Sequence, residues 1–379
     1  MEFTNIHLVT SLGFVLAMTF GAVANRTNFC TMGAVSDWVN MGLKGRLGAW
    51  VLAMGIAVAG AQILELTGLV DIGSSIYRTT NFGLGGYIIG GLLFGVGMTL
   101  SGGCGQRTLV RVGTGNLKSL VVLLILAISA YMTLRGLFAV LRVAAIEPMT
   151  IDLSEQGIAD QGLASVLSGW FGFEATNAVR WGIGLLVAAL LILWALKQEA
   201  LRESRDNLVA GIVIGLIITA AWVVTGLIGV DDFDPVPVEA MSFIAPTGNT
   251  LSYLMTFTGA TINFGIAIVF GVIAGSFLYA LFSRTFAIET FSDRSDMVNH
   301  LTGGLLMGFG GVLALGCTVG QSISGISTLA LGSFVAAISI VIGSAFTMRV
   351  QYHRMDDMGL FKAWGVGLAD VLMPWRMKD

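Results

Sequence analysis

The chain has 379 residues, of which 55% are hydrophobic and only 11% are charged, whereas an ordinary soluble domain carries about 25% charged residues. Water therefore cannot be the main solvent around this chain, and a soluble globular protein is excluded. The formal net charge of −3 is close to neutral, so nucleic-acid binding has no electrostatic basis.

Long apolar segments recur along the whole chain, and we predict about nine transmembrane helices from their lengths. The predicted spans cover residues 7–24, 46–66, 83–101, 117–140, 179–196, 208–229, 262–282, 298–315 and 327–348. The first of them superficially resembles a secretory signal, but the flank before it carries Glu2 and no Lys or Arg, so it is predicted to be a span. The fold class is therefore an all-α polytopic membrane protein, with residues 1–379 forming a single membrane domain.

Four segments between these spans are too short or too polar to cross a bilayer. They are residues 25–39, 102–112, 246–259 and 316–324. At membrane depth such segments are tolerated only where protein or a water-lined cavity shields their backbone. We therefore predict four re-entrant half-helices.

The two halves of the chain resemble each other around two Gly-Cys motifs. Residues 95–106 and 310–321 are both glycine-rich and then read Gly-Cys and Gly-Gln. Lys and Arg gather in the loops of one side, which predicts a cytoplasmic C-terminus and an outer N-terminus. On this topology, residues 1–141 and 207–379 are inverted repeats, joined by an outer loop and a span in residues 142–206. Inverted repeats place their shared site near the membrane midplane, between discontinuous helices.

Cys30, Cys104 and Cys317 are the three cysteines, and they lie far apart in the sequence. Their odd number, the lack of a C-x-x-C pair and the lack of a nearby histidine disfavour a disulfide framework or a zinc site. No metal or cofactor is expected.

The segment around Cys104 reads S-G-G-C-G-Q-R-T. Glycines such as Gly103 allow close backbone approach, and a half-helix that begins here would point free amide groups at an anion, with Arg107 one turn later. Tight helix packing alone also explains glycines in a membrane protein. A cysteine at the matching place in the second half, Cys317 after Gly316, favours function, because Ala or Ser would serve packing equally well. A thiol is a weak donor with a polarizable sulfur, suited to brief contacts with a sulfur oxyanion.

A third thiol, Cys30, follows Arg26 and Asn28, which supply a cation and an amide donor. On the predicted topology this motif faces the cytoplasm, so Cys30 is interpreted as the exit-side partner. The alternative is that Arg26 reaches the lipid head groups and Cys30 fills space. The candidate substrate-binding residues are Cys30, Cys104, Cys317, Arg26, Asn28, Gly103, Gln106, Arg107, Gly316 and Gln321.

Three other polar residues could couple proton movement to transport. His300 begins a predicted span, but a hydrogen-bonded structural role is the stronger interpretation. Glu65 and Asp37 lie near predicted membrane segments, where acids are often functional. Solvation is the stronger interpretation for both, because Glu65 lies at a span end and Asp37 lies in a polar segment.

At its cysteine motifs the chain resembles the YeeE/YedE family of bacterial inner-membrane sulfur transporters. The resemblance rests on N-F-C-x-x-G at residues 28–33, S-G-G-C-G at 101–105 and G-C-T-x-G-Q at 316–321. It implies an hourglass-like inverted-repeat bundle and thiosulfate uptake by transient S–H contacts at the three cysteines. It also implies a soluble TusA-like sulfurtransferase as a partner at the cytoplasmic face. Some relatives are linked to selenium metabolism, so another sulfur or selenium compound remains an alternative substrate.

The sequence therefore predicts a transporter rather than an enzyme, carrying thiosulfate or a related small sulfur-containing anion. Two alternatives stay open. A membrane thiol enzyme would need a low-pKa thiolate near Arg26 or Arg107, and a structural membrane subunit would move nothing by itself. The acidic outer segment of residues 142–180 matches no motif, and its sequence suggests no function.

Overall fold

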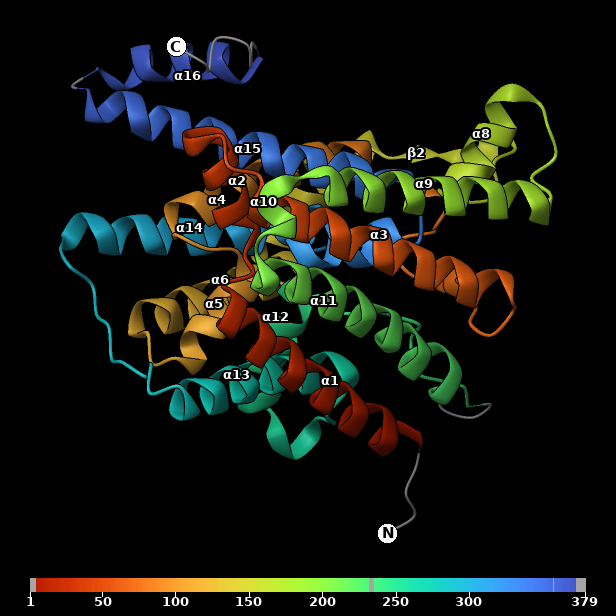
Figure 1. Ribbon diagram of the computed structural model, residues 1–379, viewed down its shortest axis with the longest axis horizontal. Coiled ribbons are helices and arrows are strands. Elements are labelled where there is room, and N and C mark those ends of the chain that lie inside the picture. Colours follow the sequence, from red (N-terminus) through yellow and green to blue (C-terminus); the bar gives the residue numbers. More distant parts are fainter. Residues whose placement is uncertain (1–4, 232–234, 357, 373–379) are drawn as a thin grey trace.

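The computed structural model describes residues 5–231, 235–356 and 358–372, and these are mostly helical (Figure 1). The helices of the first half are α1 (Asn5–Thr27), α2 (Thr31–Met41), α3 (Gly45–Leu66), η1 (Ile72–Ser74), η2 (Gly86–Gly90), α4 (Gly91–Leu100), α5 (Gly105–Gly113) and α6 (Leu117–Arg135). The connecting part holds α7 (Leu137–Leu141), η3 (Arg142–Ile146), η4 (Glu147–Met149), η5 (Leu153–Gln156), α8 (Leu163–Phe171), α9 (Asn177–Lys197) and α10 (Glu199–Arg202). The second half holds α11 (Arg205–Val223), η6 (Val224–Ile228), α12 (Ile244–Met255), η7 (Phe257–Gly259), α13 (Phe264–Phe282), α14 (Arg294–Leu313), η8 (Gly320–Gly325), α15 (Leu331–Met355) and α16 (Leu360–Leu372).

Among the described residues, eight helical segments are long and apolar enough to cross a membrane. They are Asn5–Met41, Gly45–Leu66, Gly86–Gly113, Leu117–Arg135, Asn177–Lys197, Arg205–Ile228, Phe264–Phe282 and Leu331–Met355. The all-α polytopic membrane class is thus confirmed, but the count of nine is not. The difference is α14, which covers the predicted span at 298–315 with 20 residues but begins with Arg294, Asp296 and His300 and is not among the eight.

The long helices pack in pairs that join the first half of the chain to the second: α1 lies on α13, α3 on α11, α4 on α15 and α6 on α14. Glycines bring some of these backbones into contact, as small residues do in membrane bundles. A Cβ on Gly275 would lie 1.8 Å from the carbonyl oxygen of Met18, and one on Gly21 would lie 2.2 Å from that of Val272. The α1–α13 crossing therefore leaves no room for a side chain at either glycine.

The crossing of α4 and its preceding turn η2 with α14 also has two close contacts between a glycine and a backbone carbonyl. A Cβ on Gly97 would lie 2.7 Å from the carbonyl oxygen of Gly303, and a Cβ on Gly310 would lie 2.6 Å from that of Gly90. The two contacts are reciprocal, because Gly97 and Gly310 occupy matching places in the two Gly-Cys motifs. Both helices end shortly before a cysteine, so this crossing brings the two motifs toward one another.

Short helices occupy all four segments that are predicted to be too short or too polar to cross the membrane. They are α2, α5, α12 and η8. Cys30 precedes α2 and Cys104 precedes α5 as the N-cap residue, and Cys317 lies just before η8. The prediction of short, interrupted helices at the cysteine motifs is therefore consistent with the structure.

The acidic segment after α6 packs against the rest of the molecule through Arg78. Two-residue strands β1 (Asn81–Phe82) and β2 (Ile151–Asp152) pair antiparallel. The Arg78 side chain, only 7% exposed, lies 2.9 Å from an Asp160 oxygen and 3.4 Å from a Glu65 oxygen, and donates to the carbonyl of Thr328 at 2.9 Å. Burial alone would raise the pKa of Asp160, but the hydrogen bond and charge of Arg78 hold it below its usual range. The expectation that Glu65 is solvated was wrong, because the long Arg78 side chain reaches it from the following loop.

The segment that holds Asp160 is joined to the chain that follows the Cys317 motif. The backbone amide of Leu163 donates to the carbonyl of Leu329, and that of Leu331 donates to Gln161, both at 2.9 Å. The segment therefore covers the start of α15 and is not an open acidic vestibule.

Candidate functional site

The three cysteines are fully or almost fully buried thiols that form no disulfide, with exposed fractions of 6% for Cys30 and 0% for Cys104 and Cys317. Each is placed by the same local structure. Two residues before each cysteine the backbone is left-handed, at Asn28 (φ 52°), Gly102 (φ 67°) and Leu315 (φ 57°). The next amide closes the end of the preceding helix in a Schellman-type bond: Phe29 to Ala24, Gly103 to Met98 and Gly316 to Gly311, at 3.2, 2.9 and 2.8 Å.

This repeated turn explains why the cysteines stand between helices rather than within them. The chain stops one helix in a left-handed residue and starts the next helix within a few residues, with the cysteine at the junction. Asn and Gly adopt this conformation readily, whereas Leu315 does so against a steric cost of about 1–2 kcal/mol. Residues held in such conformations gather at functional sites.

The motifs of Cys30 and Cys104 form one cluster. The two thiols are neighbours. Gln106 connects the motifs, since its amide nitrogen donates to the carbonyl of Phe29 at 3.5 Å and its oxygen lies 3.8 Å from the Cys104 sulfur. Arg107 donates to the side-chain oxygen of Asn28 at 2.8 Å. These residues therefore lie together, and their role in binding a substrate stays a prediction.

The Cys317 motif meets this cluster through Thr318. The hydroxyl of Thr318 lies beside the Cys104 thiol, although Thr318 follows directly after Cys317. The Cys317 sulfur accepts from the backbone amide of Gly320 at 3.3 Å, and the side chain of Gln321 donates to the carbonyl of Ala314. A Cβ on Gly316 would lie 3.3 Å from the Gln321 side chain, and one on Gly103 would lie 3.2 Å from that of Arg107. Both glycines keep their motifs compact.

Arg26 is the one candidate residue that the structure does not bring to the cluster. Its side chain is 62% exposed and lies 3.7 Å from a carboxylate oxygen of Asp206. The reason is that α1 continues to Thr27, so Arg26 leaves the last helical turn toward the surface. The charges that act on Cys30 come instead from Arg107 and Arg111. Arg111 donates to the carbonyl of Gly102 at 2.9 Å and was missed by the sequence analysis.

Other residues beside the cysteines carry buried polar atoms that have no hydrogen-bond partner among the described residues. They are the hydroxyls of Thr31 and Thr318, the indole nitrogen of Trp50 and the amide oxygen of Gln321. Trp50 belongs here because its ring stacks on Phe29 with centroids 4.8 Å apart. Buried polar groups are normally paired, so orphaned ones call for an explanation such as a polar ligand. Thr31 and Thr318 each follow a cysteine directly, and this position in the sequence could have identified them as site residues.

A polar cavity of about 380 Å³ opens next to this cluster. It is lined by Arg107, Arg111, Thr114, Asn116, Lys118, Glu289 and His300. Asp296 engages two of these residues, lying 2.7 Å from the Lys118 nitrogen and 3.0 Å from His300. His300 is thus a hydrogen-bonded histidine, as expected. The two arginines face the cavity from α5, and we call it the basic cavity.

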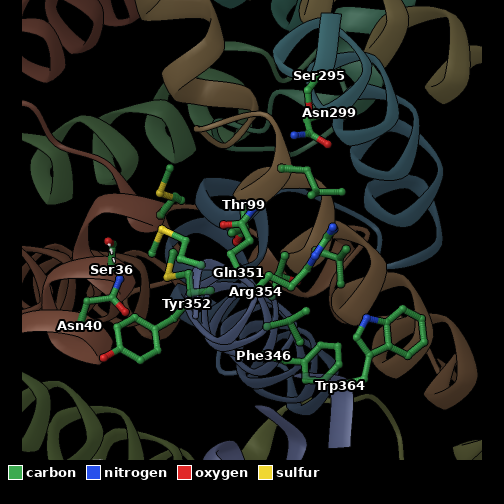
Figure 2. A pocket seen from close by; sticks show the side chains of 17 residues that line it. Ser36, Asn40, Thr99, Ser295, Asn299, Phe346, Gln351, Tyr352, Arg354 and Trp364 are labelled. Atoms are coloured by element: carbon green, nitrogen blue, oxygen red, sulfur yellow. Dashed lines mark hydrogen bonds between the residues drawn. The ribbon is translucent and has the colours of Figure 1, made fainter. Parts of the chain in front are cut away.

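A larger cavity, of about 940 Å³, lies elsewhere, between α2, α4, α14, α15 and α16 (Figure 2). Figure 2 shows Thr99, Gln351 and Arg354 near its centre and Trp364 at its edge. None of the candidate residues lines it. Size alone therefore does not identify the site, and the chemistry of the cysteine cluster does.

Among the described residues, no group of three or more His, Cys, Asp or Glu side chains could hold a metal ion. Asp37, a candidate for proton coupling, lies 3.3 Å from Arg46 with its side chain 20% exposed.

The chain is similar to known proteins along most of its length. The chain is 26% identical over 347 residues to a protein of Spirochaeta thermophila named thiosulfate transporter TsuA, covering 90% of this chain and 99% of that protein. It is 26% identical over 354 residues to a protein of Escherichia coli with the same name, covering 87% and 91%. A shorter match, 31% over 81 residues, covers 21% of this chain and 20% of the probable transporter YedE of Salmonella typhimurium. The family model described as sulphur transport matches residues 26–346, and the chain therefore belongs to this family of sulfur transporters.

Proposed function

We propose that this protein imports thiosulfate, or a closely related small sulfur-containing anion, through a relay of its three thiols. The observation that carries the proposal is that motifs from both halves meet. The Cys104 thiol neighbours Cys30 in the first half and also Thr318, which follows Cys317 in the second half. The names of the two full-length relatives support thiosulfate as the substrate.

The chemistry of the cluster suits an anion with two different ends. The terminal sulfur of thiosulfate accepts weak S–H contacts from thiols, and its oxygens accept stronger bonds from hydroxyl and indole donors. Thr31, Trp50 and Thr318 supply such donors, which are buried and unpartnered. Because each contact is weak or single, the anion passes from one to the next rather than being trapped. It leaves through the basic cavity beside Arg107 and Arg111.

We further infer that residues 1–141 and 207–379 are inverted repeats, connected by residues 142–206, with α14 as a ninth span. The helix pairs support this, because exchanging α1 with α11, α3 with α13, α4 with α14 and α6 with α15 reproduces the same set of contacts. The basic cavity then faces the cytoplasm, the C-terminus is cytoplasmic and the N-terminus lies outside, in a bacterial inner membrane. A soluble TusA-like sulfurtransferase is expected to receive the sulfur at the basic cavity.

Uptake of radiolabelled thiosulfate into proteoliposomes that contain the purified protein tests this function. We expect time-dependent uptake that unlabelled thiosulfate suppresses and that sulfate, which lacks a terminal sulfur, does not. Sulfite and selenite serve as further competitors. Failure of the purified protein to move thiosulfate contradicts the proposal and favours a structural subunit. A persulfide on a cysteine without net uptake favours the thiol enzyme.

The substitution Thr318→Val isolates the contribution of one hydroxyl. Valine keeps the shape, and the hydroxyl has no hydrogen-bond partner among the described residues, so the fold should be unaffected. We expect the uptake rate to fall about 10- to 100-fold, as for the loss of one hydrogen bond to a charged group. The matched control is Thr347→Val, whose hydroxyl bonds only within α15, to Gly343 at 2.8 Å. Equal rates for the two variants would remove Thr318 from the site.

A further inference from the structure

The segment of residues 235–243 leads to α12, and Phe243 is the residue directly before that helix. Glu239 is anchored within it by its backbone. The hydroxyl of Thr225 donates to the Glu239 carbonyl at 2.7 Å and accepts from the Glu239 amide at 3.2 Å. Thr225 is itself fully buried. The position of the Glu239 backbone is therefore fixed by a buried residue of the bundle.

A short chain of contacts runs from Glu239 to Cys317. The hydroxyl of Tyr77, only 2% exposed, interacts electrostatically with both Glu239 and Cys317. The backbone amide of Phe243 lies near the Cys317 sulfur. A Cβ on Gly320 would lie 2.6 Å from the Ser242 hydroxyl and 3.5 Å from that of Tyr77. Residues 239–243 thus connect the half-buried Glu239 to the surroundings of the buried thiol.

The carboxyl group of Glu239 is unusual because no cation or hydrogen-bond donor among the described residues pairs with its side chain. The titratable group beside it is Tyr77, which also interacts with Cys317 and Tyr87. A charged carboxylate here would repel an approaching anion in a setting where water screens it poorly. Burial raises the pKa of Glu239 to about 7. The group is therefore neutral at pH values below this and charged above it.

We propose that Glu239 is a proton-binding gate: the anion reaches Cys317 only while the Glu239 carboxyl group holds a proton. This inference rests on the proposed function, which makes the Glu239 side the outer side. The proton binds to a carboxylate oxygen from the outer medium, and no other bond is made or broken. It returns to that medium after the anion has passed, so the gate regulates access without itself supplying energy.

The test is the initial rate of thiosulfate uptake into proteoliposomes as the outer pH is varied with the inner pH held constant. Thiosulfate stays a dianion near neutral pH, so any change comes from the protein. We expect the wild-type rate to fall about tenfold from pH 6 to pH 8, following the protonated fraction of a group that titrates near 7. Glu239→Gln and Glu239→Ala should both keep the low-pH rate throughout this range. Glu155→Gln, which removes an exposed acid on the same side, should keep the wild-type profile.

The other outcomes contradict either the gate or the transport proposal. A wild-type rate that does not change with outer pH overturns the gate while leaving the transport proposal intact. The gate is also overturned if the folded Gln and Ala variants still slow down as the pH rises, or if both are inactive at every pH. Wild-type protein that takes up no thiosulfate at any pH contradicts the proposed function itself.

Discussion

Replacing Cys104 by alanine is expected to reduce thiosulfate uptake to the background of empty liposomes. Cys104 is fully buried and is the thiol that touches both Cys30 and the Thr318 of the other motif. Its loss therefore interrupts the relay at its middle step, whereas the change in side-chain volume is a single sulfur atom. The measurement is the initial uptake rate in proteoliposomes, together with growth of a cysteine-requiring host on thiosulfate as its only sulfur source.

The matched control for this substitution is Ser339→Ala, which also removes one buried heteroatom. The Ser339 hydroxyl bonds within its own helix, to the carbonyl of Val335 at 2.8 Å. It should therefore transport like the wild type. Unchanged uptake by Cys104→Ala would show that the relay hypothesis is wrong, and the same experiment with Cys317→Ala repeats the test on the second motif.

Replacing Arg78 by alanine should lower the free energy of unfolding by about 3–5 kcal/mol, the usual cost of removing one partner of a buried ion pair. Glu65 and Asp160, with side chains 14% and 20% exposed, would both lose their cation. The carbonyl of Thr328 would lose a donor as well. Thermal unfolding in detergent measures the effect. The stabilisation of Asp160 is present above its unfolded pKa, near 4, and is lost as the pH falls through its lower folded pKa.

Arg142→Ala is the control for this change, because Arg142 lies 3.3 Å from Glu147 in the same outer segment but the side chains are 31% and 49% exposed. Water screens such a pair, so its loss should cost about 1 kcal/mol or less. If the two variants unfold at the same temperature, Arg78 does not hold the segment in place.

Local patterns determined the membrane class and the interrupted helices. Apolar runs of sufficient length must become helices in a bilayer, because no other partner satisfies their backbone. The glycine-rich stretches before Cys104 and Cys317 predicted short helices at both places, and the structure has α5 and η8 there. The same local reasoning failed at Leu315, whose left-handed backbone no residue preference indicates.

Partners between distant segments could not be read from the sequence. Arg26 was assigned to the site because it precedes Cys30 by four residues, yet it faces Asp206, while Arg107 approaches Asn28 from a different helix. Glu65 was expected to meet solvent and instead meets Arg78 and its loop. Glu239 drew no attention, since nothing near it in the sequence indicates Tyr77 as its neighbour.

The sequence by itself determined that this chain is a membrane protein. It also determined at which residues the helices are interrupted and which three thiols lie at the interruptions. Only the tertiary structure decided that Thr318 lies beside Cys104 and that Arg111, not Arg26, lies near Cys30. It also decided that Tyr77 is a neighbour of both Glu239 and Cys317. The physical reason is that helix formation depends on hydropathy and backbone preferences within a few residues. The site depends on which helix surfaces pack together, and here that was set by glycine contacts between segments more than 200 residues apart, such as Gly97 with Gly303.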